Sequence, residues 1–143
     1  MTLQVLIYSG GSLVQYDNPP VVVNAIICRA GRVLLGIRGH EDGRYKLELI
    51  GGFVEIGETL EQALTREVME ETKRHCGPDV EYFGSFVGTY SDGRKLVSVV
   101  FKCPNTHESP AITDESLGFT WVDRVPENMF ADCDAEALKR FFA

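Results

Sequence analysis

Three glutamates in one short segment are the residues of this 143-residue chain best suited to chemistry. Glu67, Glu70 and Glu71 are spaced i, i+3 and i+4, so on an α-helix their side chains project from one face. An acidic face exposed to solvent is the simplest interpretation of this cluster. Clustered carboxylates are also hard oxygen ligands of the kind that Mg²⁺ or Mn²⁺ prefers.

The apolar residues before the cluster favour metal binding over a solvated face. At about 100° per residue, Leu60, Ala63 and Leu64 fall nearly in the same angular sector as the three glutamates. The face that packs inward at the start of the helix therefore becomes acidic one or two turns later. Repulsion and desolvation of three like charges there would cost on the order of several kcal/mol. A divalent cation would remove both penalties.

Glycines and one arginine flank the cluster. Gly51-Gly52 and Gly57 fit a plain hairpin or bulge. They also fit a backbone carbonyl that approaches a metal while the chain folds over the start of the helix. Arg66 can reach Glu70 at i+4, either as a surface pair worth roughly a few tenths of a kcal/mol or to hold that carboxylate in place.

The segment GGFVEIGETLEQALTREVMEET, from Gly51 to Thr72, resembles the Nudix box over most of its length. Gly52 is followed by five residues, Glu58, seven further residues and the run REVMEE at positions 66–71. With ordinary residue frequencies, so many fixed positions would coincide by chance in on the order of one chain in a hundred thousand. The segment covers about a sixth of the chain.

The end of this segment departs from the family pattern. Lys73 and Arg74 stand where glycine and an aliphatic residue are usual, and Ile50 replaces the usual proline. That glycine normally ends the helix in a left-handed conformation. Because Lys73 is not expected to adopt this conformation, we expect the helix to continue to about Cys76. Neither change removes a metal ligand.

The resemblance implies a pyrophosphohydrolase that acts on acid anhydrides. It implies Mg²⁺-dependent cleavage, with Mn²⁺ as a substitute, of the diphosphate bond in a nucleotide-type substrate by metal-activated water. The substrates suggested by similar sequences are ADP-ribose, dinucleotides and nucleoside triphosphates. The implied metal ligands are the Gly51 carbonyl and the carboxylates of Glu67, Glu70 and Glu71. Arg66 completes the expected catalytic set.

The base that takes a proton from water is a carboxylate whose identity differs among relatives. We prefer Glu67, with an acid outside the segment as the alternative. Asp114-Glu115 precedes a predicted strand and is either simple loop charge or a further metal ligand, with Glu115 preferred. The three histidines have no ligand spacing and receive no role.

Cationic and aromatic residues are the candidates for holding the substrate. Arg38 closes an otherwise apolar strand, and an aromatic ring could stack on a base. The candidate substrate-binding residues are Arg38, Arg44, Tyr45, Glu58 and Tyr90. Lys46 and Arg94 are weaker alternatives for positive charge.

Charge and composition restrict the partners. The formal net charge of −7 argues against a broad basic surface for nucleic acid. The longest apolar runs, 21–28 and 96–103, are too short to span a bilayer. The four cysteines lack zinc-ligand spacing, so we expect free thiols in a cytoplasmic protein. A small nucleotide is the expected partner, and a homodimer through the N-terminal strand is a further option.

The expected elements indicate one α/β domain over residues 1–143. Thr59 and Gln62 form a capping box for a catalytic helix at about 59–76, and Asp134 is the expected N-cap of a terminal helix ending at Phe142. This order predicts an α/β/α sandwich with a mixed central β-sheet, as the resemblance also implies. The strands are expected at 3–8, 21–28, 32–38, 47–50, 53–56, 80–90, 95–103 and 117–122.

Two other functions compete with hydrolysis. A catalytically inactive Nudix module that binds or senses a nucleotide would typically have lost carboxylates of the segment, and here all are present. An RNA-processing relative is disfavoured by the net charge and by the lack of additional basic segments.

Overall fold

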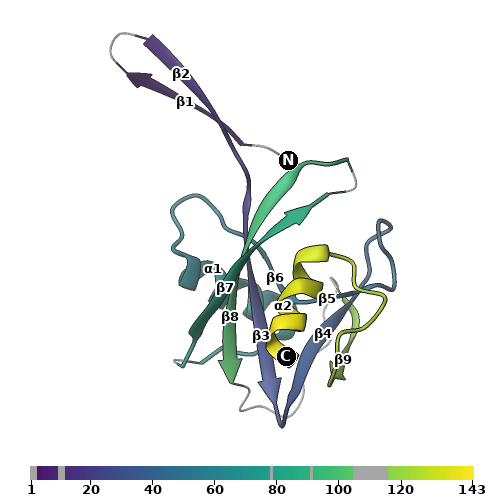
Figure 1. Ribbon diagram of the computed structural model, residues 1–143. Coiled ribbons are helices and arrows are strands. Elements are labelled where there is room, and N and C mark those ends of the chain that lie inside the picture. The colour runs from purple at the N-terminus through teal and green to yellow at the C-terminus, as the bar shows by residue number, and fades with distance from the viewer. Residues whose placement is uncertain (1–2, 10–11, 78, 91, 105–115) are drawn as a thin grey trace.

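A mixed β-sheet with one helix on each face forms the body of the molecule (Figure 1). The computed structural model describes residues 3–9, 12–77, 79–90, 92–104 and 116–143. Helix α1 (Leu60–Thr72) packs against one face and α2 (Asp132–Phe142) against the other. The predicted α/β/α sandwich with a mixed central sheet is confirmed.

Strand β3 lies at the centre of the sheet. It pairs in parallel with β8 on one side, and on the other side it pairs antiparallel with β6 and, near its end, with β4. The order across the sheet is β5-β4-β3-β8-β7, with β9 added to β4. The bounds are β3 (Val21–Arg29), β4 (Arg32–Arg38), β5 (Leu47–Glu48), β6 (Ile50–Phe53), β7 (Glu81–Thr89), β8 (Lys95–Pro104) and β9 (Ser116–Val122).

A separate antiparallel hairpin precedes the sheet. It consists of β1 (Leu3–Ser9) and β2 (Ser12–Asn18), and it projects beyond the body of the molecule (Figure 1). The sequence predicted the first of these strands, but it did not predict the second.

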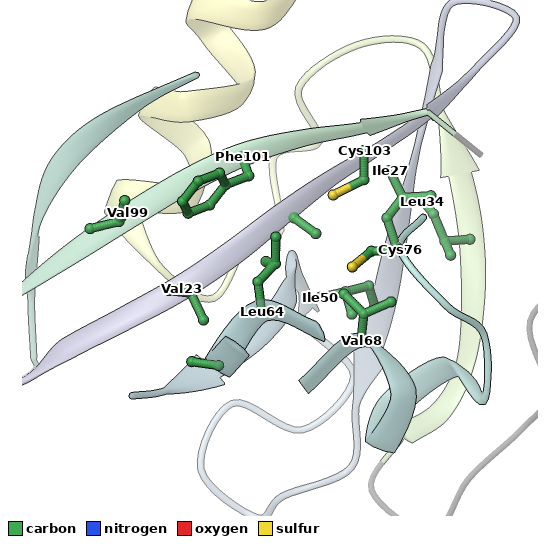
Figure 2. Close-up of a cluster of buried hydrophobic side chains, with 12 residues drawn as sticks. Val23, Ile27, Leu34, Ile50, Leu64, Val68, Cys76, Val99, Phe101 and Cys103 are labelled. Atoms are coloured by element: carbon green, nitrogen blue, oxygen red, sulfur yellow. The ribbon is translucent and has the colours of Figure 1, made fainter. Parts of the chain in front are cut away.

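Two apolar cores lie on opposite faces of the sheet. The core on the α1 side joins Leu64 and Val68 of the helix to β3, β6 and β8, as Figure 2 shows. The core on the α2 side joins Ala137 and Leu138 to Ile26 and neighbouring strand residues. Because β3 supplies side chains to both, its near-continuous apolar run is that of a strand buried on both faces.

Helix α1 begins as predicted and ends earlier than predicted. Thr59 and Gln62 form the expected capping box. The expected continuation to Cys76 is wrong, because Lys73 adopts a left-handed conformation at φ 57° and caps the helix after Thr72. The buried Thr72 hydroxyl accepts the N–H of Arg74 at 3.2 Å. Cys76 then enters the α1-side core, and its burial offsets the strain at Lys73.

The start of α2 also differs from its prediction. The helix begins at Asp132 with Ala131 as N-cap, so Asp134 is not the cap. Asp134 is buried inside the first turn, where its Oδ2 accepts the N–H of Leu49 at 3.0 Å. The Asp134 carboxylate therefore makes a long-range contact with Leu49, whereas the sequence had predicted that it would cap its own helix.

The remaining strands agree with their predicted positions to within a few residues, except that Gly51-Gly52 lie inside β6 and not between two extended pieces. All four cysteines are free. Within the described residues, no helix has the length and apolar character needed to cross a membrane.

Candidate functional site

The candidate site begins at the two glycines of β6. Gly51 pairs with Asn24 and Gly52 with Val23 on the central strand. A Cβ at Gly51 would collide with the Val23 carbonyl oxygen and with Asn24, so only glycine lets β6 lie this close to β3. Asn24 is buried and donates from Nδ2 to Ser98 Oγ at 2.8 Å.

Glu67 lies directly over the second glycine. A Cβ at Gly52 would occupy the space that the Glu67 carboxyl group fills. The Glu67 side chain is 12% exposed, and Leu64 and Val68 beside it are buried in the α1-side core. Of the three glutamates that the sequence placed on the inward sector, Glu67 faces inward, and the missing Gly52 side chain makes room for it. Glu70 does not, because its side chain is 47% exposed.

Arg66 connects the glutamates around the start of α1. Its Nε and Nη2 donate to the two carboxylate oxygens of Glu58 at 2.7 and 2.9 Å. Its Nη1 donates to Glu67 at 2.8 Å and to Glu70 at 3.3 Å, and Nη2 also reaches the Phe53 carbonyl at 3.0 Å. The predicted Arg66–Glu70 contact is confirmed, but the paired contact with Glu58 is the shorter and more geometrically fixed one.

These contacts shift the pKa values of Glu58 and Arg66 so that both groups stay charged. The hydrogen bond from Arg66, aided by the Glu55 N–H, lowers the pKa of Glu58 to about 2. The Glu58 hydrogen bond raises the pKa of Arg66, and Glu67 adds to the effect. Both groups are therefore ionised across the range in which enzymes work, and Arg66 is a fixed positive charge among carboxylates.

The carboxylates of α1 have the ligand chemistry of a Mg²⁺ site. All donors are oxygens, and Glu67 abuts the β6 backbone that carries the Gly51 carbonyl. Within the described ranges, no three carboxylate, histidine or cysteine side chains lie close enough to hold a metal ion as they stand. Instead, the Arg66 guanidinium lies between Glu67 and Glu70. Glu70 is 47% exposed, so its side chain has room to reorient.

The other candidate metal ligands lie at the end of α1 and before β9. Glu71 is half-buried near the end of the same helix. Asp114 and Glu115 lie outside the described residues, immediately before β9. The assignment of Glu115 as a further ligand therefore stays a prediction.

The substrate-binding candidates fall into two groups besides Glu58. Arg38 donates from Nη1 to Glu48 at 2.9 Å, and its guanidinium lies 3.9 Å from the Phe130 ring centroid. The Arg44 guanidinium lies over the Tyr45 ring, which is 66% exposed. Tyr90, at the β7–β8 turn, lies beside Arg94, and burial raises the pKa of its hydroxyl. The structure places Arg38, at the end of β4, beside the loop that carries Arg44 and Tyr45, where the Tyr45 N–H donates to the Arg38 carbonyl at 2.9 Å.

Sequence reasoning missed four parts of this site. It did not identify Glu58, Glu55 or the Phe53 carbonyl as partners of Arg66, or the buried Asn24–Ser98 contact beside Gly51. The separation of Arg66 from Glu58 by eight positions is not a neighbouring helical spacing. Only the turn before α1 brings the two side chains together.

Comparison with known proteins gives the family. Residues 18–141 match the NUDIX domain. The chain is 35% identical over 117 residues to a MutT-like protein of Streptomyces ambofaciens, covering 78% of this chain and 72% of that protein. It is 32% identical over 111 residues to an oxidized purine nucleoside triphosphate hydrolase of Danio rerio, covering 75% and 70%.

Solved structures agree on the fold. The crystal structure of a MutT NUDIX hydrolase from Burkholderia pseudomallei superposes with a TM-score of 0.75 at 24% identity, over 85% of this chain and 97% of the other. The NUDIX domain match and the two relatives above 30% identity show that the chain belongs to the Nudix hydrolase family. Its class is that of the pyrophosphohydrolases, enzymes that act on acid anhydrides.

Proposed function

We propose that this protein, as one domain over residues 1–143, hydrolyses the diphosphate bond of a nucleotide-type substrate in a Mg²⁺-dependent reaction. The observation that carries the proposal is the Glu67 carboxylate, held over Gly52 and beside Arg66 on the inward face of α1. Desolvation of an inward-facing carboxylate costs free energy, which the Arg66 contact offsets here, and a charged group held in this way is a candidate for a functional site.

In such a reaction the residues of the site would have separate roles in metal binding, proton transfer and positioning. Glu67, Glu70 and Glu71 would hold Mg²⁺, which neutralises diphosphate charge and makes water more acidic when bound. Glu67, the least exposed of the carboxylates paired with Arg66, is the preferred group to accept the proton of the attacking water. Arg66 orients Glu67 and Glu70 through one nitrogen while Glu58 fixes the other side of the guanidinium. Arg66 thus acts as a positioning residue.

Nucleoside triphosphates are the first substrates to test, since the Danio rerio relative is named for that substrate class. ADP-ribose and dinucleotides complete the screen, because they contain the same diphosphate linkage. The products expected are a nucleoside monophosphate and a phosphorylated remainder or pyrophosphate.

The experiment measures melting temperature and turnover against Mg²⁺ concentration on the same sample. Mg²⁺ that binds only the folded protein should stabilise it by roughly 1.5–3 kcal/mol at tens to a hundredfold excess over Kd. That corresponds to a rise of several degrees in melting temperature. Turnover should appear over the same range of concentration, because one site produces both effects.

Two variants sharpen the test. Glu67→Gln should abolish most turnover and reduce the metal-dependent rise in melting temperature. Glu61→Gln removes a charge from an exposed position in the first turn of the same helix and should preserve both. Stabilisation by Mg²⁺ without cleavage of any substrate would favour a nucleotide-binding module. No response of either quantity to Mg²⁺ would mean that the carboxylates serve only the Arg66 network.

A further inference from the structure

A buried hydrogen bond links two strands of the sheet beside the candidate site. Asn24 of β3 donates from Nδ2 to Ser98 Oγ of β8 at 2.8 Å, and the two residues are 7% and 0% exposed. Both side chains lie on the α2 side of the sheet, because Ile26 and Val100, two positions further along the same strands, belong to the α2-side core. A polar pair therefore occupies a place where apolar side chains would pack without the cost of removing polar groups from water.

The Asn24 side chain lies directly against Gly51. A Cβ on Gly51 would collide with Asn24 Oδ1, just as a Cβ on Gly52 would collide with the Glu67 carboxylate. Successive residues of a strand face opposite sides of the sheet. The spaces left by the two missing side chains are therefore filled from opposite faces, by Asn24 from the α2 side and by Glu67 from the α1 side.

The backbone hydrogen bonds of β6 direct the Gly51 carbonyl away from β3. The N–H of Val54 donates to the Val21 carbonyl at 2.9 Å, so these two residues form a hydrogen-bonded pair. Such pairs alternate with non-hydrogen-bonded pairs along an antiparallel ladder, and the register makes Gly51 and Asn24 a non-hydrogen-bonded pair. The N–H and C=O groups of Gly51 therefore point away from the central strand, on the side where a ligand can approach.

The two glycines do not by themselves fix the direction of this carbonyl. Glycine adopts a wide range of φ and ψ values, so the peptide group between Gly51 and Gly52 depends on its neighbours for a single orientation. The Ser98 hydroxyl holds the Asn24 amide in one orientation against Gly51. An aliphatic side chain of similar size would fill the space without this restraint. Hydrogen bonds to the groups behind a metal ligand are a common means of orienting that ligand.

We propose that Asn24, held by Ser98, is a positioning residue that fixes the direction of the Gly51 carbonyl for metal binding. The inference rests on the proposed function, in which this carbonyl joins the carboxylates of α1 as a ligand of Mg²⁺. It adds to the site a pair of residues outside the segment from Gly51 to Thr72, on the other face of the sheet from α1. Asn24 acts through Gly51 and contacts neither the metal nor the substrate.

The main test is a double variant, Asn24→Leu with Ser98→Ala. It removes both partners of the hydrogen bond, so neither is left buried without a partner, and the melting temperature of the metal-free protein should change little. Binding of Mn²⁺ to the intact protein is measured by electron paramagnetic resonance, which reports the free ion. We expect the double variant to bind Mn²⁺ about tenfold more weakly than the parent. The rise in its melting temperature at a fixed Mg²⁺ concentration should be smaller for the same reason.

The single variants show whether the two residues act as one unit. Asn24→Leu and Ser98→Ala should each weaken Mn²⁺ binding, and their effects should not add, because the same hydrogen bond is lost in both. Each single variant should melt below the double variant, since it leaves one polar partner buried and unpaired. Ser98→Ala is the smallest change and carries the same test if the double variant does not fold.

Val100→Ala is the matched control for a purely structural effect. Val100 is buried two positions from Ser98 on the same face of β8. Its truncation should lower the melting temperature by several degrees through lost packing, and it should leave Mn²⁺ binding unchanged.

Three results would count against the inference. Equal Mn²⁺ binding by the parent and the double variant would overturn it and leave the proposed function standing. Equal weakening of Mn²⁺ binding by Val100→Ala and by the double variant would overturn it by showing that the pair only stabilises the sheet. Absence of Mn²⁺ binding by the parent would overturn the proposed function and this inference together.

Discussion

Replacing Asp134 with asparagine should change how the stability of the protein depends on pH. The Asp134 side chain is buried, and its Oδ2 accepts one hydrogen bond from the Leu49 N–H. Burial raises the pKa of this carboxyl group from an ordinary 3.8 to about 7, opposed by the Leu49 hydrogen bond and reinforced by the nearby Glu48. The asparagine amide would retain an oxygen acceptor for the Leu49 N–H but carry no charge.

The sign of the effect follows from proton binding. Between pH 4 and 7 the folded state holds a proton at Asp134 that the unfolded state has released, so stability falls as pH rises. A pKa difference of about three units, at about 1.4 kcal/mol per unit, corresponds to about 4 kcal/mol. Above about pH 7 this loss is complete, and below about pH 4 it is absent.

Urea denaturation of Asp134→Asn and of the parent protein between pH 4 and 8 tests this reasoning. The variant should be more stable by up to about 4 kcal/mol at pH 8, a difference on the order of 10 °C in melting temperature. The two proteins should converge near pH 4. Asp79→Asn, at an exposed aspartate, serves as the matched control and should follow the parent. Parallel pH profiles for parent and Asp134→Asn would refute a neutral buried carboxyl group.

The backbone of the site and of the helix end supports three further predictions. Gly52→Ala should lower turnover with little change in melting temperature, since the new methyl displaces only the flexible end of Glu67; unchanged turnover would show that the position of Glu67 is immaterial. Gly51→Ala should melt several degrees lower, because its methyl meets the rigid Val23 carbonyl, and an unchanged melting temperature would contradict that contact. Lys73→Gly should raise the free energy of unfolding by about 1 kcal/mol in urea denaturation, because glycine adopts positive φ without strain. A loss of stability would indicate that the lysine side chain makes a compensating contact.

The parts of the fold that sequence reasoning predicted are those with local causes. Thr59 and Gln62 satisfy each other's backbone groups within four residues, so the start of α1 can be deduced without knowing the rest of the chain. The spacing of Glu67 and Glu70 likewise determines their shared helix face. The mixed sheet follows from the order of apolar runs and helices.

The parts that it did not predict depend on contacts between distant segments. Lys73 adopts a left-handed conformation where the chain leaves the helix, and Cys76 then joins the α1-side core. Asp134 contacts Leu49, 85 positions away, and not the start of its own helix. The main partner of Arg66 is Glu58 because the intervening turn brings them together. None of these contacts has a local sequence pattern.

The parallel pairing of β3 with β8 has a consequence for how the protein folds. Asn24, beside Gly51, is held by Ser98, a residue 74 positions further along the chain. Helix α1 and the β7–β8 hairpin join near neighbours and can form within microseconds. The β3–β8 ladder must first close a loop that contains most of the domain, which raises the contact order and slows folding. The strand beneath the two glycines of β6 is therefore completed late, and a refolding chain should regain helical circular dichroism before it regains enzymatic turnover.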